Sequence, residues 1–343
     1  MENQLFSSNK PFVIAEMSAN HNQSLHRALK VVEAAAKCGV DALKLQTYTA
    51  DSMTLNVQNP EFQIRDKKNL WKGIRLYDLY KKAHTPWEWH LPIFDKCKEL
   101  GLLAFSSPFD EKAVDFLESL NVPCYKIASF EINHLPLIRK VASTGKPLII
   151  STGMASLAEI DEAVRVARGS GCNELVLLKC TSNYPADPTE SNIRTIPHMK
   201  EMFSCNVGIS DHTLGIGVSV ASIALGASVI EKHLTLSRSD GGVDAAFSLE
   251  PDEMESLVKE VNRASQSLGN IIYGPAEGEL DPRRRRRSIY ISAPMCKGEV
   301  LTRENMKIIR PGLGLPPKYF DHLLGKTIKA DVKEGTPLSW DLI

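Results

Sequence analysis

Short apolar runs alternate with stretches of helical periodicity from residue 12 to residue 268. The apolar runs are continuous and not interleaved with polar residues, which is typical of strands buried on both faces and therefore of a parallel sheet. The predicted strands cover residues 12–16, 42–46, 102–107, 124–128, 147–152, 174–180, 206–210 and 228–233. The predicted helices cover residues 25–38, 87–100, 111–120, 135–142, 157–169, 193–202, 215–225 and 251–268.

About eight strand-then-helix units of this length predict a (β/α)8 barrel, with a doubly wound open sheet as the alternative. In a barrel, the polar residues that end the strands line one mouth. Polar residues follow every predicted strand: Glu16, Asn20, Lys44, Gln46, Ser106, Ser107, Lys126, Ser129, Glu131, Ser151, Thr152, Lys179, Ser182, Tyr184, Ser210, His212 and His233. Lysines, hydroxyls and carboxylates gathered in this way predict a site that binds an anion.

Two stretches interrupt the alternation. Residues 49–82 are polar and irregular, which predicts a long insertion over one face of the barrel. Residues 271–287 are rich in Gly, Pro and Glu and end in five arginines, Arg283 to Arg287, which indicates a linker. Because acidic residues directly precede the arginines, a solvated connector or an intersubunit contact explains them better than a nucleic-acid or phosphate site. The chain therefore divides into a barrel domain over 1–270, a linker over 271–287 and a C-terminal domain over 288–343.

The predicted C-terminal domain contains an internal repeat. Five residues of its first half recur with the same spacing in its second half: Ile291, Ala293, Met295, Gly298 and Leu301, and then Ile328, Ala330, Val332, Gly335 and Leu338. Each copy predicts a strand of period two, a turn at the glycine, and a short helix capped by Thr302 or Ser339. Two copies would make a small β-rich domain whose core is marginal, so we expect it to dock on another surface.

Composition excludes several classes of partner. Lys plus Arg equals Asp plus Glu, at 41 each, so no overall field favours nucleic acid or an anionic membrane. No apolar run approaches the roughly 20 residues of a spanning helix, and the first residues lack the form of a signal peptide. The seven cysteines are scattered without a CxxC motif, which suits a reducing compartment. We expect a soluble cytoplasmic protein.

Two of the predicted strands lead into a histidine beside or near a carboxylate, in the segments 208–213 and 229–234. Imidazoles on neighbouring strand ends, here His212 and His233, would place two ligands around a divalent metal. The alternative is that each histidine only packs or forms hydrogen bonds.

Lysines and hydroxyls at the same edge suit a phosphate or a phosphate-bearing carboxylate. Three lysines, Lys44, Lys126 and Lys179, are placed to do this, and any of them would alternatively form a Schiff base if it were desolvated. The carboxylates Glu16, Glu131 and Asp244 would move protons, orient a sugar, or form salt bridges to neighbouring lysines.

Eight ordered segments resemble the sialic acid synthase family: residues 14–21, 44–49, 105–109, 125–131, 151–154, 180–185, 208–213 and 231–233. The C-terminal domain resembles that family's antifreeze-like domain (SAF, β-clip), with Arg310, Pro311 and Gly312 at the expected place. The resemblance covers essentially the whole chain. Within the family, residues 18–21, 46–49 and the segment around Trp71 are most similar to the pseudaminic acid branch; the N-acetylneuraminate and legionaminic acid branches are the alternatives.

The resemblance implies a metal-dependent condensation of phosphoenolpyruvate with an N-acetylated amino sugar, releasing phosphate. It implies a phosphoenolpyruvate site of Lys44, Ser107, Lys126, Ser129, Ser151, Ser182, Tyr184 and Ser210, although the family often has asparagine where Ser182 stands. It implies sugar contacts from Asn20, Glu131, Asp244 and Arg310. It also implies that His212 and His233 bind a divalent metal, Mn²⁺, Mg²⁺ or Co²⁺.

Two further roles follow from the same resemblance. Glu16 or Glu131 would handle the protons of the attacking water. Arg310 would reach the barrel of the other subunit, which implies a swapped homodimer. More remote hypotheses are an aldolase that forms a Schiff base on a lysine, and a carbohydrate-binding protein without enzymatic activity.

Overall fold

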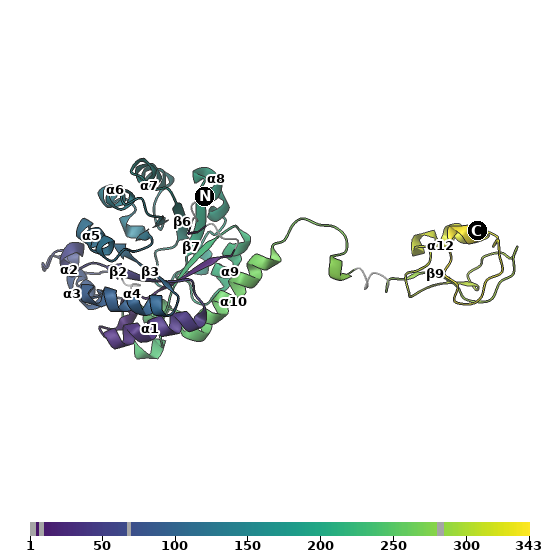
Figure 1. Ribbon diagram of the computed structural model, residues 1–343, viewed down its shortest axis with the longest axis horizontal. Coiled ribbons are helices and arrows are strands. Elements are labelled where there is room, and N and C mark those ends of the chain that lie inside the picture. Colours follow the sequence, from purple (N-terminus) through teal and green to yellow (C-terminus); the bar gives the residue numbers. More distant parts are fainter. Residues whose placement is uncertain (1–4, 7–9, 67–69, 280–284) are drawn as a thin grey trace. The chain divides into compact units, whose positions relative to one another are not determined.

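The computed structural model describes residues 5–6, 10–66, 70–279 and 285–343. The chain splits into two compact units, Met1–Gly269 and Asn270–Ile343 (Figure 1). Each unit has its own buried apolar cluster. No helix within the described ranges is long and apolar enough to cross a membrane.

The first unit is a closed barrel of eight parallel strands in chain order. The strands are β1 (Phe12–Glu16), β2 (Ala42–Thr47), β3 (Leu103–Pro108), β4 (Tyr125–Ile127), β5 (Leu148–Ser151), β6 (Leu175–Cys180), β7 (Asn206–Ser210) and β8 (Val229–His233). The barrel closes where β1 pairs with β8, with Glu16 opposite His233. The predicted (β/α)8 barrel is therefore confirmed, and the open sheet is excluded.

Helices surround the strands (Figure 1). They are α1 (Leu25–Cys38), α4 (His90–Glu99), α5 (Glu111–Ser119), α6 (Leu135–Ala142), α7 (Leu157–Gly169), α8 (Thr195–Phe203), α9 (Gly217–Ala224) and α10 (Pro251–Ser267). Local chemistry sets their ends. The Ser24 hydroxyl accepts a hydrogen bond from the Arg27 amide at the start of α1, and Gly39 ends that helix in the left-handed region, at φ 76°.

The described part of the predicted insertion is partly helical. It contains α2 (Ala50–Met53), a 3-10 turn (Pro60–Phe62) and α3 (Leu76–Ala83). Between them the chain doubles back, with the Ile64 amide donating to the Ile74 carbonyl at 3.0 Å. The Trp71 indole nitrogen donates to the Val243 carbonyl at 3.0 Å, which ties the insertion to the loop after β8.

The second unit pairs β9 (Ser288–Ile291) with β10 (Met306–Ile309) in an antiparallel ladder. Three of the repeated residues from each copy lie in its core: Ile291, Met295, Leu301, Ile328, Val332 and Leu338. One prediction was wrong, because no helix follows Thr302. Residues 303–305 form a turn, in which the Thr302 hydroxyl accepts from the Glu304 amide. Ser339 does precede a short 3-10 turn, Trp340–Leu342.

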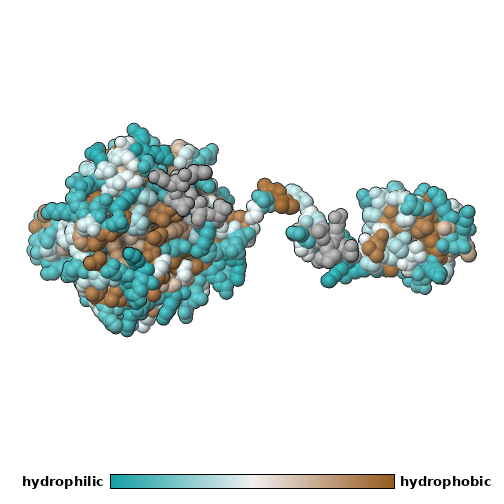
Figure 2. Space-filling model, viewed as in Figure 1, coloured by the Kyte–Doolittle hydropathy of each residue, from teal (hydrophilic) through white to brown (hydrophobic). Residues whose placement is uncertain are grey.

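The stretch after α10 carries exposed apolar side chains, with Ile271 93% and Ile272 73% exposed (Figure 2). A single 3-10 turn, Glu277–Glu279, is the regular structure assigned in its described part. Of the arginine run, Arg283 and Arg284 lie outside the described residues, and Arg285 to Arg287 are exposed.

Candidate functional site

A cavity of about 390 Å³ opens where the barrel strands end. Its polar side, here called the floor, comes from strand ends and the residues just after them: Lys44, Lys126, Ser129, Ser151, Ser182, Ser210, His212, Glu231 and His233. In TIM barrels this is the face that carries catalytic residues.

Two lysines and two glutamates form a buried ionic network at the floor. The Lys44 ammonium lies 2.7 Å from a Glu16 carboxylate oxygen and 3.6 Å from Glu231. The Lys126 ammonium lies 3.5 Å from the other Glu231 oxygen, which also accepts from the Ser210 hydroxyl at 3.0 Å. All four charged side chains are at most 4% exposed. The network therefore holds two cations at the cavity in fixed positions.

The charge states of the network follow from burial and its partners. Burial opposes ionisation of Glu231, but Lys126 and Lys44 more than offset it and hold the pKa of that carboxyl at about 2. Burial raises the pKa of Glu16, and Lys44 only partly opposes this. Glu231 is thus a firm carboxylate, whereas Glu16 is the easier of the two to protonate.

Hydroxyl groups and one glycine make a small cradle beside the lysines. The Ser129 and Ser182 hydroxyl oxygens lie 2.8 Å apart, and the buried Ser151 hydroxyl has no hydrogen-bond partner among the described residues. Gly153 has φ 48°, and a Cβ there would lie 2.5 Å from the Ser129 Cβ. Since any side chain at 153 would invade the cradle, glycine is required by space as well as by backbone conformation.

The two histidines face each other across neighbouring strands, with ring centroids 5.4 Å apart. His212 Nδ1 lies 2.9 Å from the Thr181 carbonyl oxygen, which fixes the ring and leaves Nε2 as the free nitrogen. His233 Nδ1 is buried without a hydrogen-bond partner among the described residues. Burial lowers the pKa of His233 well below its usual range, so this imidazole is neutral, as a metal ligand must be. Burial also opposes the charged form of His212, but the Cys180 thiol more than offsets it and raises the pKa of this imidazole.

These residues fit a divalent metal held by two imidazoles. Within the described residues there is no group of three or more His, Cys, Asp and Glu placed to hold an ion. A metal bound here would therefore complete its coordination with oxygens from water or substrate, which is typical of catalytic sites.

Two further carboxylates, those of Glu131 and Asp244, line the cavity. One Glu131 oxygen is buried without a hydrogen-bond partner among the described residues, and burial raises the pKa of this carboxyl to about 7 although Lys126 opposes the shift. Burial also raises the pKa of Asp244, which accepts from the Ala19 amide at 3.2 Å.

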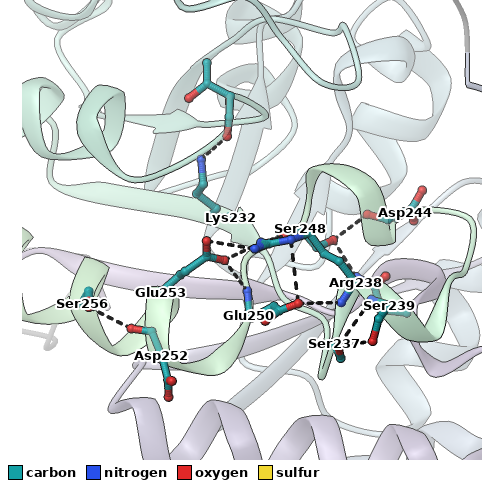
Figure 3. Close-up of polar contacts among 12 residues, drawn as sticks. Lys232, Ser237, Arg238, Ser239, Asp244, Ser248, Glu250, Asp252, Glu253 and Ser256 are labelled. Carbon is teal, nitrogen blue, oxygen red and sulfur yellow. Dashed lines mark hydrogen bonds and ion pairs between the residues drawn. The ribbon is translucent and has the colours of Figure 1, made fainter.

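Hydrogen bonds hold the loop that carries Asp244 (Figure 3). The Ser248 hydroxyl donates to the Asp244 carbonyl at 2.7 Å, and the Arg238 guanidinium donates to the Ser248 carbonyl at 3.1 Å. Arg238 also donates to a Glu253 oxygen at 3.1 Å on α10. These contacts tie the Asp244 loop to the helix that follows it.

Most of the predicted site residues line this cavity: Lys44, Lys126, Ser129, Glu131, Ser151, Ser182, Tyr184, Ser210, His212, His233 and Asp244. Glu16 and Ser107 stand behind Lys44, whose ammonium lies 3.4 Å from the Ser107 hydroxyl. Arg310 is an exposed residue of the second unit.

Six predicted residues of the mouth are absent from the cavity wall: Glu16, Asn20, Ser106, Ser107, Thr152 and Lys179. The Asn20 amide donates to the Leu234 carbonyl at 2.9 Å and to the Ser248 hydroxyl at 2.8 Å, because the turn after β1 folds back on the β8 loop. Its sugar contact is therefore not supported. Lys179 donates to the Cys180 carbonyl at 2.8 Å and is absent from the cavity wall, since side chains alternate along β6 and Cys180 takes the inner face.

Sequence reasoning missed Glu231 as a site residue. The signal was present, because Glu231 stands two residues before His233 and period-two alternation places both on one face of β8. From the sequence, only the histidine of this segment is predicted to be a site residue.

Comparisons with known proteins give a consistent result. Residues 31–273 match the NeuB family, and residues 286–343 match the SAF domain. The chain is 44% identical over 329 residues to the pseudaminic acid synthase of Campylobacter jejuni, covering 96% of this chain and 95% of that protein. It is 41% identical over 337 residues to the pseudaminic acid synthase of Helicobacter pylori, covering 96% and 97%.

Among solved structures, the chain resembles N-acetylneuraminic acid synthetase from Leptospira borgpetersenii in complex with citrate, with a TM-score of 0.72 and 30% identity. That match covers 82% of this chain and 93% of the other.

Proposed function

The chain belongs to the NeuB family, and we propose that it catalyses the pseudaminic acid synthase reaction. Phosphoenolpyruvate, 2,4-diacetamido-2,4,6-trideoxy-L-altrose and water give pseudaminic acid and phosphate. The observation that carries this proposal is the near full-length identity, 41% and 44%, to two proteins of that name. The cavity supports it, because it combines cations and hydroxyls suited to an enol phosphate with two imidazoles.

We assign the binding of phosphoenolpyruvate to the floor lysines and hydroxyls. Lys44 and Lys126 supply two fixed positive charges, and Ser129 and Ser151 supply short donors, with Ser107, Ser182 and Tyr184 beside them. Ser210, whose hydroxyl proton is donated to Glu231, holds that carboxylate next to the lysines. Preorganised charge of this kind holds an anion without reorganisation during the reaction. Its main effect is to orient the methylene carbon of the enol phosphate toward the sugar.

A divalent metal on His212 and His233, for which Mn²⁺, Mg²⁺ and Co²⁺ are the candidates, would act as a Lewis acid on the sugar aldehyde. The sugar must be ring-opened, since a closed pyranose has no free aldehyde. Replacement of His212 or His233 by alanine should abolish both Mn²⁺ binding, measured by electron paramagnetic resonance, and turnover. The exposed His198→Ala variant is the control.

In the reaction, the methylene carbon of the enol phosphate forms a bond to the aldehyde carbon, the aldehyde C=O π bond breaks, and its oxygen takes up a proton to become a hydroxyl. Positive charge develops at the former enol carbon. Water adds there, loses a proton, and the tetrahedral intermediate expels phosphate. We assign the acceptance of that proton to Glu131, whose unpartnered oxygen and pKa of about 7 suit a general base. Glu16 is held by Lys44 at 2.7 Å, so its role is to position that lysine.

We further propose a homodimer in which Arg310 of a second copy binds an acetamido carbonyl of the sugar. The described residues that line the cavity include no arginine, and Arg310 is exposed on the second unit. An exposed guanidinium that forms no side-chain hydrogen bond or ion pair with another described residue is available for such a contact.

The alternative of a Schiff base is weaker on this geometry. Burial favours a neutral Lys44 amine, but Glu16 and Glu231 more than offset it and raise the pKa of the ammonium. Such a lysine is a charge and not a nucleophile. Borohydride treatment in the presence of the sugar should therefore leave Lys44 unlabelled. Burial lowers the pKa of Lys126 and of Lys179, so a label on either of these lysines would favour the Schiff base.

The deciding experiment measures phosphate release from phosphoenolpyruvate with each candidate sugar, with and without a chelator. We expect release with the L-altro diacetamido sugar, little with N-acetylmannosamine or with a diacetamido trideoxy sugar of another configuration, and loss of release on chelation. Release with another of these sugars only would assign the chain to the N-acetylneuraminate or legionaminic acid reaction. Sugar binding without phosphate release from any of them would indicate a carbohydrate-binding protein.

A further inference from the structure

The insertion between β2 and α4 contributes an apolar side to the cavity wall. We call this side the apolar roof; its residues are Met53, Ile64, Leu76 and Leu79. All four belong to the insertion between β2 and α4, whereas the polar wall residues Gln46, Glu131 and Asp244 belong to strand ends and to the β8 loop. The insertion therefore supplies an apolar cluster to the cavity, in addition to the apolar side chains of Phe109, Phe130 and Phe247 elsewhere in its wall.

A hydrogen bond and side-chain packing hold the roof in place. The Trp71 indole nitrogen, from the same insertion, donates to the Val243 carbonyl at 3.0 Å, and Val243 and Trp71 both line the cavity. Two further lining residues, Tyr48 and Tyr80, pack edge to face with ring centroids 5.9 Å apart. Leu79 is only 7% exposed, so the roof is a packed surface and not a loose flap.

The chemistry of the proposed reaction sets the direction of the sugar in the cavity. Its aldehyde carbon, C1, must lie on the floor, where the histidines and the enol phosphate meet. In a ring-opened hexose, C6 is the carbon furthest from C1 along the chain. Resting on the proposed function, we propose that the apolar roof binds the C6 methyl group of a 6-deoxy sugar and discriminates against a 6-hydroxyl group.

The roof residues have no side-chain group that would donate or accept a strong hydrogen bond. A methyl group gains from contact with them, and a hydroxyl group buried there would lose its bonds to water without replacement. An apolar surface rejects an added hydroxyl only moderately, so the expected preference in kcat/KM is roughly 10- to 100-fold.

The experiment compares 2,4-diacetamido-2,4,6-trideoxy-L-altrose with its 6-hydroxy counterpart, 2,4-diacetamido-2,4-dideoxy-L-altrose, by phosphate release. Ile64→Asn and Leu76→Asn test the roof, since both residues are partly exposed and tolerate a polar group. Ile74→Asn is the matched control. Ile74 accepts a backbone bond from Ile64 in the same turn of chain, is 40% exposed, and does not line the cavity.

We expect the native enzyme to prefer the 6-deoxy sugar, both roof variants to bring the ratio of kcat/KM values toward one, and Ile74→Asn to retain the native ratio. The KM for phosphoenolpyruvate should stay unchanged in all three. Equal turnover of the two sugars by the native enzyme would overturn the roof proposal, as would equal losses on both sugars in the roof variants. Failure of the native enzyme to release phosphate with either sugar would instead overturn the proposed function.

Discussion

Individual side chains at the barrel mouth have charge states that their neighbours impose. Glu231 is ionised because two buried lysines flank it. Glu131 can gain or lose a proton near neutral pH because burial raises the pKa of its carboxyl to about 7. Both are glutamates within one cavity. Their different environments let one serve as a fixed charge and the other as a proton acceptor.

The pH dependence of turnover should report Glu131. A general base acts in its deprotonated form, which for Glu131 predominates above pH 7, so kcat/KM should rise with pH through about 7. Glu131→Gln should remove that limb and lower the plateau roughly 100-fold. Rate measurements from pH 5 to 9 test this, with the exposed Glu162→Gln variant as control. A limb that persists in Glu131→Gln would contradict the assignment.

Gly153 offers a steric test of the hydroxyl cradle. Gly153→Ala puts a Cβ 2.5 Å from the Ser129 Cβ and should lower kcat/KM for phosphoenolpyruvate roughly 10- to 100-fold by displacing the serine. Gly145→Ala is a matched control, because Gly145 has φ 73° but nothing within 4 Å of its added Cβ. Similar kinetic losses in the two variants would mean that backbone strain, and not the cradle, is responsible.

At the scale of elements, adjacent strands are joined just outside the barrel wall. Lys232 lies between Glu231 and His233 on β8, so alternation points it away from the cavity. Its ammonium lies 2.8 Å from an Asp211 oxygen and donates to the Thr213 carbonyl at 2.6 Å. Both side chains of the pair are at most 1% exposed. This pair connects the ends of β7 and β8, next to His212 and His233.

Lys232→Met should therefore destabilise the barrel by about 3–5 kcal/mol, because it leaves the Asp211 carboxylate buried without its countercharge. Lys146→Met is the control. It removes a partly exposed pair with Glu118 at 2.7 Å and should cost about 0–1 kcal/mol. Urea unfolding monitored by circular dichroism measures both. The double variant Asp211→Leu with Lys232→Met should recover part of the lost stability. Equal losses of stability in Lys232→Met and Lys146→Met would contradict the role of the Lys232–Asp211 pair in joining β7 to β8.

At the scale of the whole molecule, the chain consists of two units with separate cores. The barrel contributes the cavity, and the second unit contributes Arg310 on an exposed segment. In the proposed homodimer each complete site needs a barrel from one copy and an arginine from the other.

Subunit mixing tests this arrangement. Arg310→Ala and Lys126→Ala should each be nearly inactive alone, because one lacks the sugar contact and the other a phosphate contact. Unfolded and refolded together in equal amounts, they should recover roughly a quarter of native activity, since half of the dimers are hybrid and each hybrid has one intact site of two. No recovery, alongside normal refolding of the native enzyme, would place Arg310 in the site of its own chain or outside any site.

Local sequence patterns predicted much of this structure. The run lengths, the continuous apolar strands and the residues that end them were enough to predict eight βα units and a barrel mouth, because periodicity and capping depend on residues close in sequence. The same reasoning located His212 and His233, since both stand at or just beyond strand ends. The C-terminal repeat likewise predicted core positions, although not the turn after Thr302.

The sequence by itself determined which residues reach the mouth of the barrel, and the tertiary structure alone decided what they do to one another. Glu231 became a site residue through Lys44 and Lys126, which lie far from it in the chain. The Asn20 side chain forms a hydrogen bond to the Leu234 carbonyl and does not line the cavity. The insertion supplies the apolar roof, which includes Ile64. Burial, pKa values and cavity walls depend on contacts between distant segments, which no local pattern contains.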